Sequence, residues 1–251
     1  MDSQENISHA NLSTFMIEVL DKLLDGGLLI GHIYEFDGRL RVGKTLFCLS
    51  ISLQFALSNK GVLFLDTNAG FDSYVARMIL AKLGSPENDV RITLNRIHVQ
   101  RVIDLNTLKE VLEFIIREKS EMTDYHLLII DCMDTFFLWT FDLDFKSKEY
   151  AKNRATLTEC FNLLNQVAKE CGFTVILTNL VLTKKDDSKI ERDSFKMGLQ
   201  IDRMNENIPF TRLRIDEVSP DSAERRISVI SSKLLAEKEQ ITLTISNKGF
   251  L

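Results

Sequence analysis

The sequence is poor in the residues that build disulfide-rich, zinc-binding and low-complexity proteins. Its 251 residues include four cysteines, three prolines and one tryptophan. The four cysteines and four histidines are scattered without ligand spacing, which argues against a disulfide framework and against a metal site built from these residues. Cys48 and Cys132 lie within apolar segments, so we expect them to be reduced residues of the core.

Long apolar runs and an excess of positive charge are also missing. No apolar segment reaches the length of a membrane span, and residues 1–13 are polar rather than signal-like, so we expect no membrane contact. The formal net charge is −5. A protein that grips nucleic acid by itself usually carries a basic excess. Any contact with DNA is therefore expected in loops or through a partner.

Residues 38–45 match the phosphate-binding pattern G-x-x-x-x-G-K-[ST] at every fixed position. The run reads Gly38, Arg39, Leu40, Arg41, Val42, Gly43, Lys44 and Thr45. Gly38 and Gly43 allow the backbone to bend and to present N–H groups to the β-phosphate of a nucleoside triphosphate. Lys44 is expected to reach the β- and γ-phosphates, and the Thr45 hydroxyl to bind Mg²⁺. The alternative is a glycine turn with an incidental Lys-Thr pair.

The segments around this loop favour the nucleotide site. Residues 31–36 are predicted to form a strand, and residues 46–58 a buried helix whose positive N-terminal end faces the phosphates. Further along the chain, a strand is predicted over residues 125–131, in which four apolar residues directly precede Asp131. In nucleotide-binding α/β proteins such a strand brings its carboxylate to the Mg²⁺ shell. The alternative is a strand that merely ends at a solvated aspartate.

The rest of the pattern predicts one α/β domain with a central, mostly parallel sheet flanked by helices and followed by antiparallel strands. We assign residues 1–17 to an N-terminal tail and residues 18–251 to a single core domain. Helices are predicted at 15–24, 72–83, 105–119 and 152–172. Strands are predicted at 62–66, 96–100, 173–179, 211–217, 226–232 and 240–246, with Gly249 as a turn.

The order of these motifs resembles the RecA family, specifically the eukaryotic strand-exchange recombinases and their paralogues. Residues 20–28 are similar to the family's entry segment, and the phosphate loop includes the Arg41 found in the recombinase. The resemblance spans roughly residues 18–251, and among the paralogues it is strongest to the D-type group in a nematode-like form. It implies a RecA-like P-loop NTPase core that binds ATP and Mg²⁺, a nuclear location and a role in homologous recombination DNA repair.

Two departures from the family pattern concern hydrolysis. The family's second strand ends Asp-Thr-Glu-Gly, and that glutamate positions the attacking water, whereas Asn68 occupies its place here. An amide orients water but accepts no proton, and loss of a positioned base typically costs about 10²–10⁴-fold in rate. The family glutamine that senses the γ-phosphate is replaced by Leu180. The resemblance therefore implies ATP binding with weak or absent hydrolysis, and we assign no catalytic residue.

The segments that resemble the family's DNA loops are weakly basic. The first covers residues 140–150, and the second runs from Lys184 to Asp193, where acidic neighbours nearly cancel the basic residues. Direct contact with single-stranded DNA is therefore expected to be weak or indirect, and a solvated mobile loop is an equally good interpretation. The short tail leaves no room for the family's N-terminal helical domain and linker strand, which favours a protomer that caps a filament end.

Three functions remain open at this point. The leading one is a regulatory recombinase paralogue that binds ATP and caps, stabilises or remodels a recombinase filament on single-stranded DNA. It would act in a complex with another paralogue or an accessory subunit. The second is an active DNA-stimulated ATPase, against which Asn68 and Leu180 argue. The third is a small-molecule P-loop kinase, which would need an arginine-bearing lid where this chain has strands.

Overall fold

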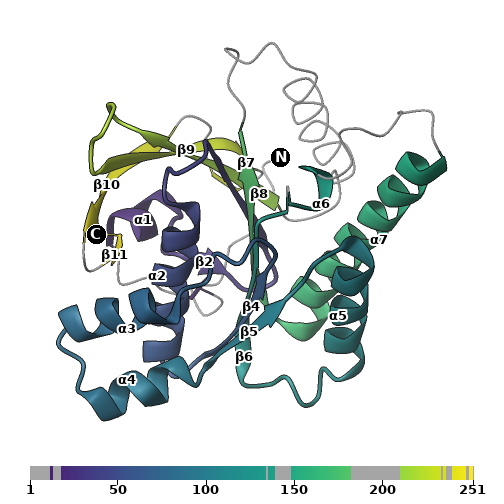
Figure 1. Ribbon diagram of the computed structural model, residues 1–251, viewed down its shortest axis with the longest axis horizontal. Coiled ribbons are helices and arrows are strands. Elements are labelled where there is room, and N and C mark those ends of the chain that lie inside the picture. Colours follow the sequence, from purple (N-terminus) through teal and green to yellow (C-terminus); the bar gives the residue numbers. More distant parts are fainter. Residues whose placement is uncertain are drawn as a thin grey trace, which may run out of the picture.

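The computed structural model describes residues 12–13, 18–133, 135–138, 148–181, 210–232, 234–235, 239–246 and 249–250. Most strands of this part of the chain join one nine-stranded sheet, in the order β11-β10-β9-β8-β3-β7-β6-β4-β5 (Figure 1). The strands are β1 Leu12–Ser13, β2 Leu28–Leu29, β3 Ile33–Gly38, β4 Gly61–Asp66, β5 Ile97–Arg101, β6 Tyr125–Asp131, β7 Thr174–Leu180, β8 Phe210–Glu217, β9 Glu224–Ser232, β10 Gln240–Ser246 and β11 Gly249–Phe250.

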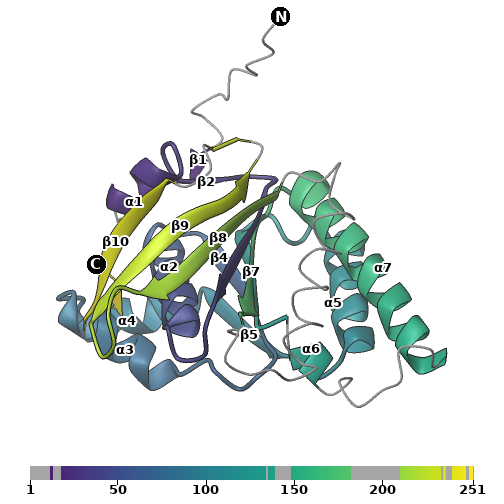
Figure 2. The same cartoon turned by 90° about the horizontal axis from the view of Figure 1, so that it is seen from above.

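The sheet is parallel on one side and antiparallel on the other. β3 pairs in parallel with both β7 and β8, and β4 pairs in parallel with β6 and β5. β9, β10 and β11 continue the sheet from β8 in antiparallel pairs, and these C-terminal strands curve away from the parallel part (Figure 2). The predicted α/β fold, with its mostly parallel sheet and C-terminal antiparallel strands, is confirmed.

Helices cover both faces of this sheet. They are α1 Glu18–Leu23, α2 Lys44–Leu57, α3 Ser73–Lys82, α4 Glu87–Leu94, α5 Leu105–Arg117, α6 Thr135–Leu138 and α7 Lys148–Cys171. α2, α3 and α4 lie on one face, and α5 and α7 on the other (Figure 1). Successive residues of a strand point to opposite faces, so Phe36 joins the core around α2 while Ile33 joins the core under α5 and α7. Buried on both faces, β4 and β6 contain long apolar runs, whereas β3 also buries the charged residues Glu35 and Asp37.

The predicted elements are found, with small shifts at their ends. The strands predicted at 125–131 and 240–246 have the same bounds as β6 and β10, and α2 begins two residues before the predicted 46. Cys48 and Cys132 are buried in the core, as predicted. The prediction missed α4, which begins directly after Pro86 and has acidic residues in its first turn, both ordinary signals of a helix start.

Two short strands also differ from the sequence prediction. Leu12 and Ser13, within the predicted tail, pair in antiparallel fashion with Leu29 and Leu28. Gly249, predicted as a turn, begins β11 with φ at 88° and pairs with Ser246. The pairing of β1 with β2 joins separate segments, which local composition does not encode. The second expected DNA loop lies outside the described residues. So does the first, apart from 148–150, which begin α7.

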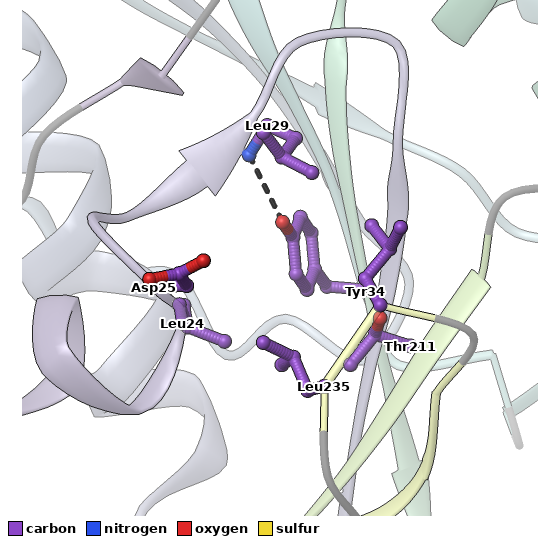
Figure 3. Close-up of a pocket in the computed structure, with 7 residues that line it drawn as sticks. Leu24, Asp25, Leu29, Tyr34, Thr211 and Leu235 are labelled. Atoms are coloured by element: carbon purple, nitrogen blue, oxygen red, sulfur yellow. Dashed lines mark hydrogen bonds between the residues drawn. The ribbon is translucent and has the colours of Figure 1, made fainter. Parts of the chain in front are cut away.

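A small cavity lies under the start of β3, between β2, β8 and the segment after α1 (Figure 3). Its volume of about 20 Å³ is room for one water molecule. The Tyr34 hydroxyl accepts the Leu29 N–H there over 2.9 Å, and burial raises the pKa of Tyr34 well above its ordinary value. The cavity is too small for an organic ligand, so we treat it as part of the core. Among the described helices, none is both long and apolar enough to cross a bilayer.

Candidate nucleotide site

A cleft of about 710 Å³ opens where the parallel strands end. Its lining comes from the segments that follow β3, β4 and β6, with Leu180 of β7 at one side. The carboxyl ends of parallel strands are where open α/β sheets bind ligands. Of the predicted site residues, Leu40, Arg41, Gly43, Lys44, Thr45 and Asp131 line the cleft. Gly38, Arg39 and Val42 form the remainder of the loop.

The two glycines of the loop are required by its backbone. Gly38 ends β3, and a Cβ there would lie 2.6 Å from the Ile215 carbonyl oxygen. Gly43 precedes α2 with φ at 100°, in the left-handed region that glycine adopts most easily. Arg41 also has a positive φ, of 66°. The backbone of the loop therefore has positive φ at two positions and a close approach to β8 at Gly38, so it bends where the motif places its glycines.

Lys44 is the first residue of α2, and its side chain folds back across the loop. Its Nζ donates hydrogen bonds to the Gly38 carbonyl oxygen over 2.7 Å and to the Arg39 carbonyl oxygen over 2.9 Å. The N-terminal end of α2 adds backbone N–H groups and the positive end of the helix dipole to the same spot. The arrangement places a cation and a helix N-terminus together, which is the chemistry of a phosphate site.

Asp131 ends β6 as a buried carboxylate with one uncompensated oxygen. The residue is 1% exposed, and its Oδ1 accepts the Thr178 hydroxyl over 2.5 Å. Its Oδ2 has no hydrogen-bond partner within the described part of the chain. Burial raises the pKa of Asp131, and the nearby Thr178 and Thr45 hydroxyls oppose that shift. A buried oxygen without a partner needs a physical reason, and a hard cation such as Mg²⁺ supplies one.

Thr45 and Asp131, the two predicted magnesium ligands, both lie next to Gly70. A Cβ on Gly70 would lie 3.1 Å from Cγ2 of Thr45 and 3.5 Å from Oδ2 of Asp131. Both side chains therefore face the same small space beside the loop. The residues present fit a magnesium ion held between a threonine hydroxyl and a carboxylate, as expected for a nucleotide-bound metal.

The segment after β4 is held over the cleft by Asp66. Its carboxylate accepts the backbone N–H groups of Asn68, Gly70 and Phe71 over 3.0 to 3.3 Å. Arg101 pairs with the same carboxylate at 3.3 Å. Asn68 lines the cleft, and its Oδ1 would be 2.6 Å from a Cβ on Gly70. The side chain in the position of the family glutamate is therefore at the cleft and is an amide.

A buried charged cluster behind the loop was missed by the sequence interpretation. Asp37, directly before the phosphate loop, is fully buried and accepts hydrogen bonds from Arg212 and Arg214 of β8 over 2.8 to 3.0 Å. Glu35 accepts the Asn179 amide and lies 3.6 Å from Arg212. The alternation of apolar and polar residues in β8 was visible in the sequence, but its pairing with the acidic residues of β3 depends on the order of the strands in the sheet.

The chain matches the Rad51 family model over residues 10–251. It belongs to the Rad51 family. The predicted resemblance to RecA-family recombinase paralogues is thereby confirmed, and the family is one whose members bind ATP with Mg²⁺.

The chain is similar to DNA repair proteins named as RAD51 homologues in animals and plants. The chain is 28% identical over 71% of its length to human DNA repair protein RAD51 homolog 2. It is 29% identical over 88% to DNA repair protein RAD51 homolog of Solanum lycopersicum, and 26% identical over 83% to DNA repair protein RAD51 homolog 4 of Bos taurus. These alignments span 48%, 63% and 62% of the respective relatives. The chain therefore corresponds to about half to two thirds of their length.

Proposed function

We propose that this chain is a regulatory recombinase paralogue of the nucleus that binds Mg·ATP and splits it slowly or not at all. Bound nucleotide orders the chain for association with another paralogue or an accessory subunit. The complex then modulates a recombinase filament on single-stranded DNA, by capping, stabilising or remodelling it. One observation carries the proposal: the phosphate loop and an Asp131 oxygen that has no hydrogen-bond partner among the described residues share a cleft with Asn68 and Leu180.

The binding half of this proposal rests on the loop and the two predicted metal ligands. Backbone N–H groups of the loop and the Lys44 ammonium would hold the β- and γ-phosphates, and Thr45 with Asp131 would hold Mg²⁺. When bound, the ion neutralises phosphate charge. Lys44 exchanges its two carbonyl acceptors for charged phosphate oxygens, which are stronger hydrogen-bond partners.

The hydrolytic half rests on the carboxylates that line the cleft. Among the described residues these are Asp72 and Asp131. Asp72 accepts the N–H groups of Tyr74 and Val75 as the cap of α3, and Asp131 faces the predicted metal position. Asp66, behind them, already accepts three backbone N–H groups. Asp72 and Asp131 thus already serve as a helix cap and as a predicted metal ligand, and Asn68 accepts no proton, so we infer that the cleft favours binding over turnover.

The test of these two halves is a pair of measurements on the wild-type chain and on Lys44→Ala. We expect calorimetry to show Mg·ATP binding to the wild type and none to the variant, because the motif assigns the Lys44 ammonium to the β- and γ-phosphates. Steady-state phosphate release by the wild type should stay near the background of the variant. Brisk release with or without single-stranded DNA would favour the active ATPase. Phosphate transfer to a nucleoside would favour the kinase.

A partner surface is available at the end of the sheet. β5 is the last strand on that side, and the described chain pairs it only with β4. Val99 on β5 is 38% exposed and Ile103 just beyond it is 68% exposed. An open strand edge with apolar side chains is a template for an extended segment of another chain. We propose this edge as the contact for the partner subunit.

This part of the proposal is tested by capture of recombinase and paralogue subunits from nuclear extract. Val99→Glu should abolish capture, whereas Ile92→Glu on the neighbouring α4, where the side chain is 48% exposed, should leave it intact. Capture by the wild type should increase with Mg·ATP, and electron microscopy should place the protein at filament ends or along filaments. Equal loss in both variants would argue against the β5 edge. Capture of no recombination protein at all would argue against the function.

A further inference from the structure

Arg225 contacts the phosphate loop from a strand nearly two hundred residues away in the chain. Its Nε donates to the Val42 carbonyl oxygen over 2.8 Å. The same guanidinium donates to the Ser222 and Glu224 carbonyl oxygens over 2.5 and 3.0 Å, and lies 3.3 Å from the Glu217 carboxylate. The residue is 7% exposed. The guanidinium is therefore held in one orientation by the turn between β8 and β9, and it presents one N–H to the loop.

The hydrogen bond from Arg225 fixes the orientation of the peptide group between Val42 and Gly43. A trans peptide places its N–H opposite its C=O, so fixing the Val42 carbonyl toward Arg225 directs the Gly43 N–H away from Arg225. Gly43 lines the cleft, and its N–H is one of the groups that the motif assigns to the β-phosphate. Arg225 therefore acts on the orientation of a phosphate-binding donor without touching the phosphate.

Side chains of the last two strands, β10 and β11, pack against the same peptide at Gly43. A Cβ on Gly43 would lie 2.9 Å from Cδ1 of Ile245 and 3.3 Å from Cζ of Phe250. β11 is itself attached to α2, since the Phe250 N–H donates to the Ser50 hydroxyl oxygen over 3.3 Å. Figure 1 shows β11 beside α2. The Val42–Gly43 peptide is thus enclosed by β9, β10 and β11 and has little freedom to rotate.

We infer that Arg225 is a positioning residue for the β-phosphate of a nucleoside di- or triphosphate, acting through the Val42–Gly43 peptide. The inference rests on the proposed nucleotide binding and adds a residue to it that the motif does not contain. By holding the peptide before the ligand arrives, Arg225 removes the cost of ordering it on binding. The C-terminal strands thereby become part of the nucleotide site, although among the described residues they contribute no side chain to its lining.

The test compares Arg225→Gln with Arg226→Gln, an arginine one residue further along β9 on the opposite face of the strand. Affinities for Mg·ATP and Mg·ADP are measured by calorimetry at a temperature where circular dichroism shows each variant fully folded. We expect Arg225→Gln to weaken both nucleotides by about tenfold, the scale of one hydrogen bond from a charged group. Arg226→Gln should bind like the wild type. A purely structural role would leave the affinities of the folded variant unchanged.

A measurement on the wild-type chain covers the case in which Arg225→Gln does not fold. In nuclear magnetic resonance spectra of the ligand-free chain, the Arg225 Nε–H proton should exchange slowly with solvent, because its bond to the Val42 carbonyl oxygen is already made. Mg·ADP should then shift the Gly43 amide signal. Rapid exchange of the Arg225 Nε–H proton before binding, or a Gly43 amide signal that Mg·ADP leaves in place, would overturn the inference. A wild-type chain without affinity for either nucleotide would instead sink the proposed function, so the two failures are distinguishable.

Discussion

Asn68 and Leu180 are the residues at which the cleft departs from a hydrolytic site, and both line it beside the phosphate loop. The Asn68 backbone is held by the Asp66 carboxylate, so its side chain starts from a constrained position. Replacing an amide by a carboxylate there changes chemistry more than shape. A single substitution at position 68 therefore tests whether a missing base limits hydrolysis.

Asn68→Glu should raise the rate of phosphate release by at least tenfold. A carboxylate at this position accepts a proton from water, and a positioned base is worth about 10²–10⁴-fold when its geometry is complete. Leu180 still lacks a donor for the γ-phosphate, so we expect a gain near or below the lower end of that range. Asn68→Gln is the control, since it has the same length without a base, and it should stay at the wild-type rate. Equal rates in the two variants would show that the base is not the missing element.

The backbone of the loop gives a second prediction at this scale, with Gly84 as its reference. Gly43 and Gly84 both have positive φ, of 100° and 83°, but a Cβ on Gly84 would meet nothing within 4 Å. Gly84→Ala should lower the free energy of unfolding by about 1 kcal/mol through backbone strain alone. Gly43→Ala adds contact with Ile245 and Phe250 and should cost about 1–3 kcal/mol more. Urea denaturation of both variants measures the difference, and similar losses would mean that the C-terminal strands yield easily.

The elements around the loop are joined by polar contacts that lie inside the sheet. Asp37 connects β3 to β8 through Arg212 and Arg214. His32 connects the same two strands at their other end, because its Nε2 lies 2.8 Å from the Thr211 hydroxyl. Thr211 in turn contacts the Ser232 hydroxyl of β9 over 2.9 Å. The antiparallel strands that brace the loop are therefore linked to β3 by side-chain hydrogen bonds as well as by the backbone pairing of β8 with β3.

His32 predicts how this attachment responds to pH. Burial lowers the pKa of His32 from 6.5 to about 4, so the unfolded chain takes up a proton that the folded chain does not. The contribution of neutral His32 to the free energy of unfolding is fully present above pH 6.5 and is lost as the pH decreases toward 4. At pH 5 the loss from His32 is about 2 kcal/mol, for 1.5 pH units at about 1.36 kcal/mol each. His32→Gln should reduce the dependence measured by denaturation at pH 7.5 and pH 5. His98→Gln, at an exposed position on β5, should leave it unchanged.

At the scale of the whole molecule, the cleft couples both halves of the core to the ligand. α2 belongs to the apolar cluster on one face of the sheet, and β6, which carries Asp131, contributes to the clusters on both faces. A ligand that bridges the loop and Asp131 therefore binds only the folded arrangement. Bound nucleotide should therefore stabilise the described domain as a whole against unfolding.

Mg·ATP at about 100 times its dissociation constant should add about 2.7 kcal/mol to the free energy of unfolding. For a chain of this size the thermal midpoint then increases by about 5–10 °C. Lys44→Ala should show no such increase, and removal of Mg²⁺ with a chelator should reduce it in the wild type. Scanning calorimetry measures all three. An equal increase for Lys44→Ala would place the ligand somewhere other than the loop.

Residues that are neighbours in the chain predicted the phosphate loop, the strand that ends at Asp131 and the helix that follows Gly43. These features are encoded by spacing within a few residues, because two glycines, a lysine and a threonine can act on one phosphate group only at fixed intervals. The bounds of β6 and β10 were predicted for the same reason, since alternation and apolar runs are local properties. The amide at position 68 was likewise visible without coordinates.

Contacts between distant segments could be seen only after folding. The bond from Arg225 to Val42, the pairing of Asp37 with Arg214 and the packing of Phe250 on Gly43 all join residues from opposite ends of the chain. Strand order and register bring such groups together. Both arise from the packing of whole elements, which the local spacing of residues does not predict. Whether an arginine is solvated or holds a loop in shape was therefore decided by the sheet.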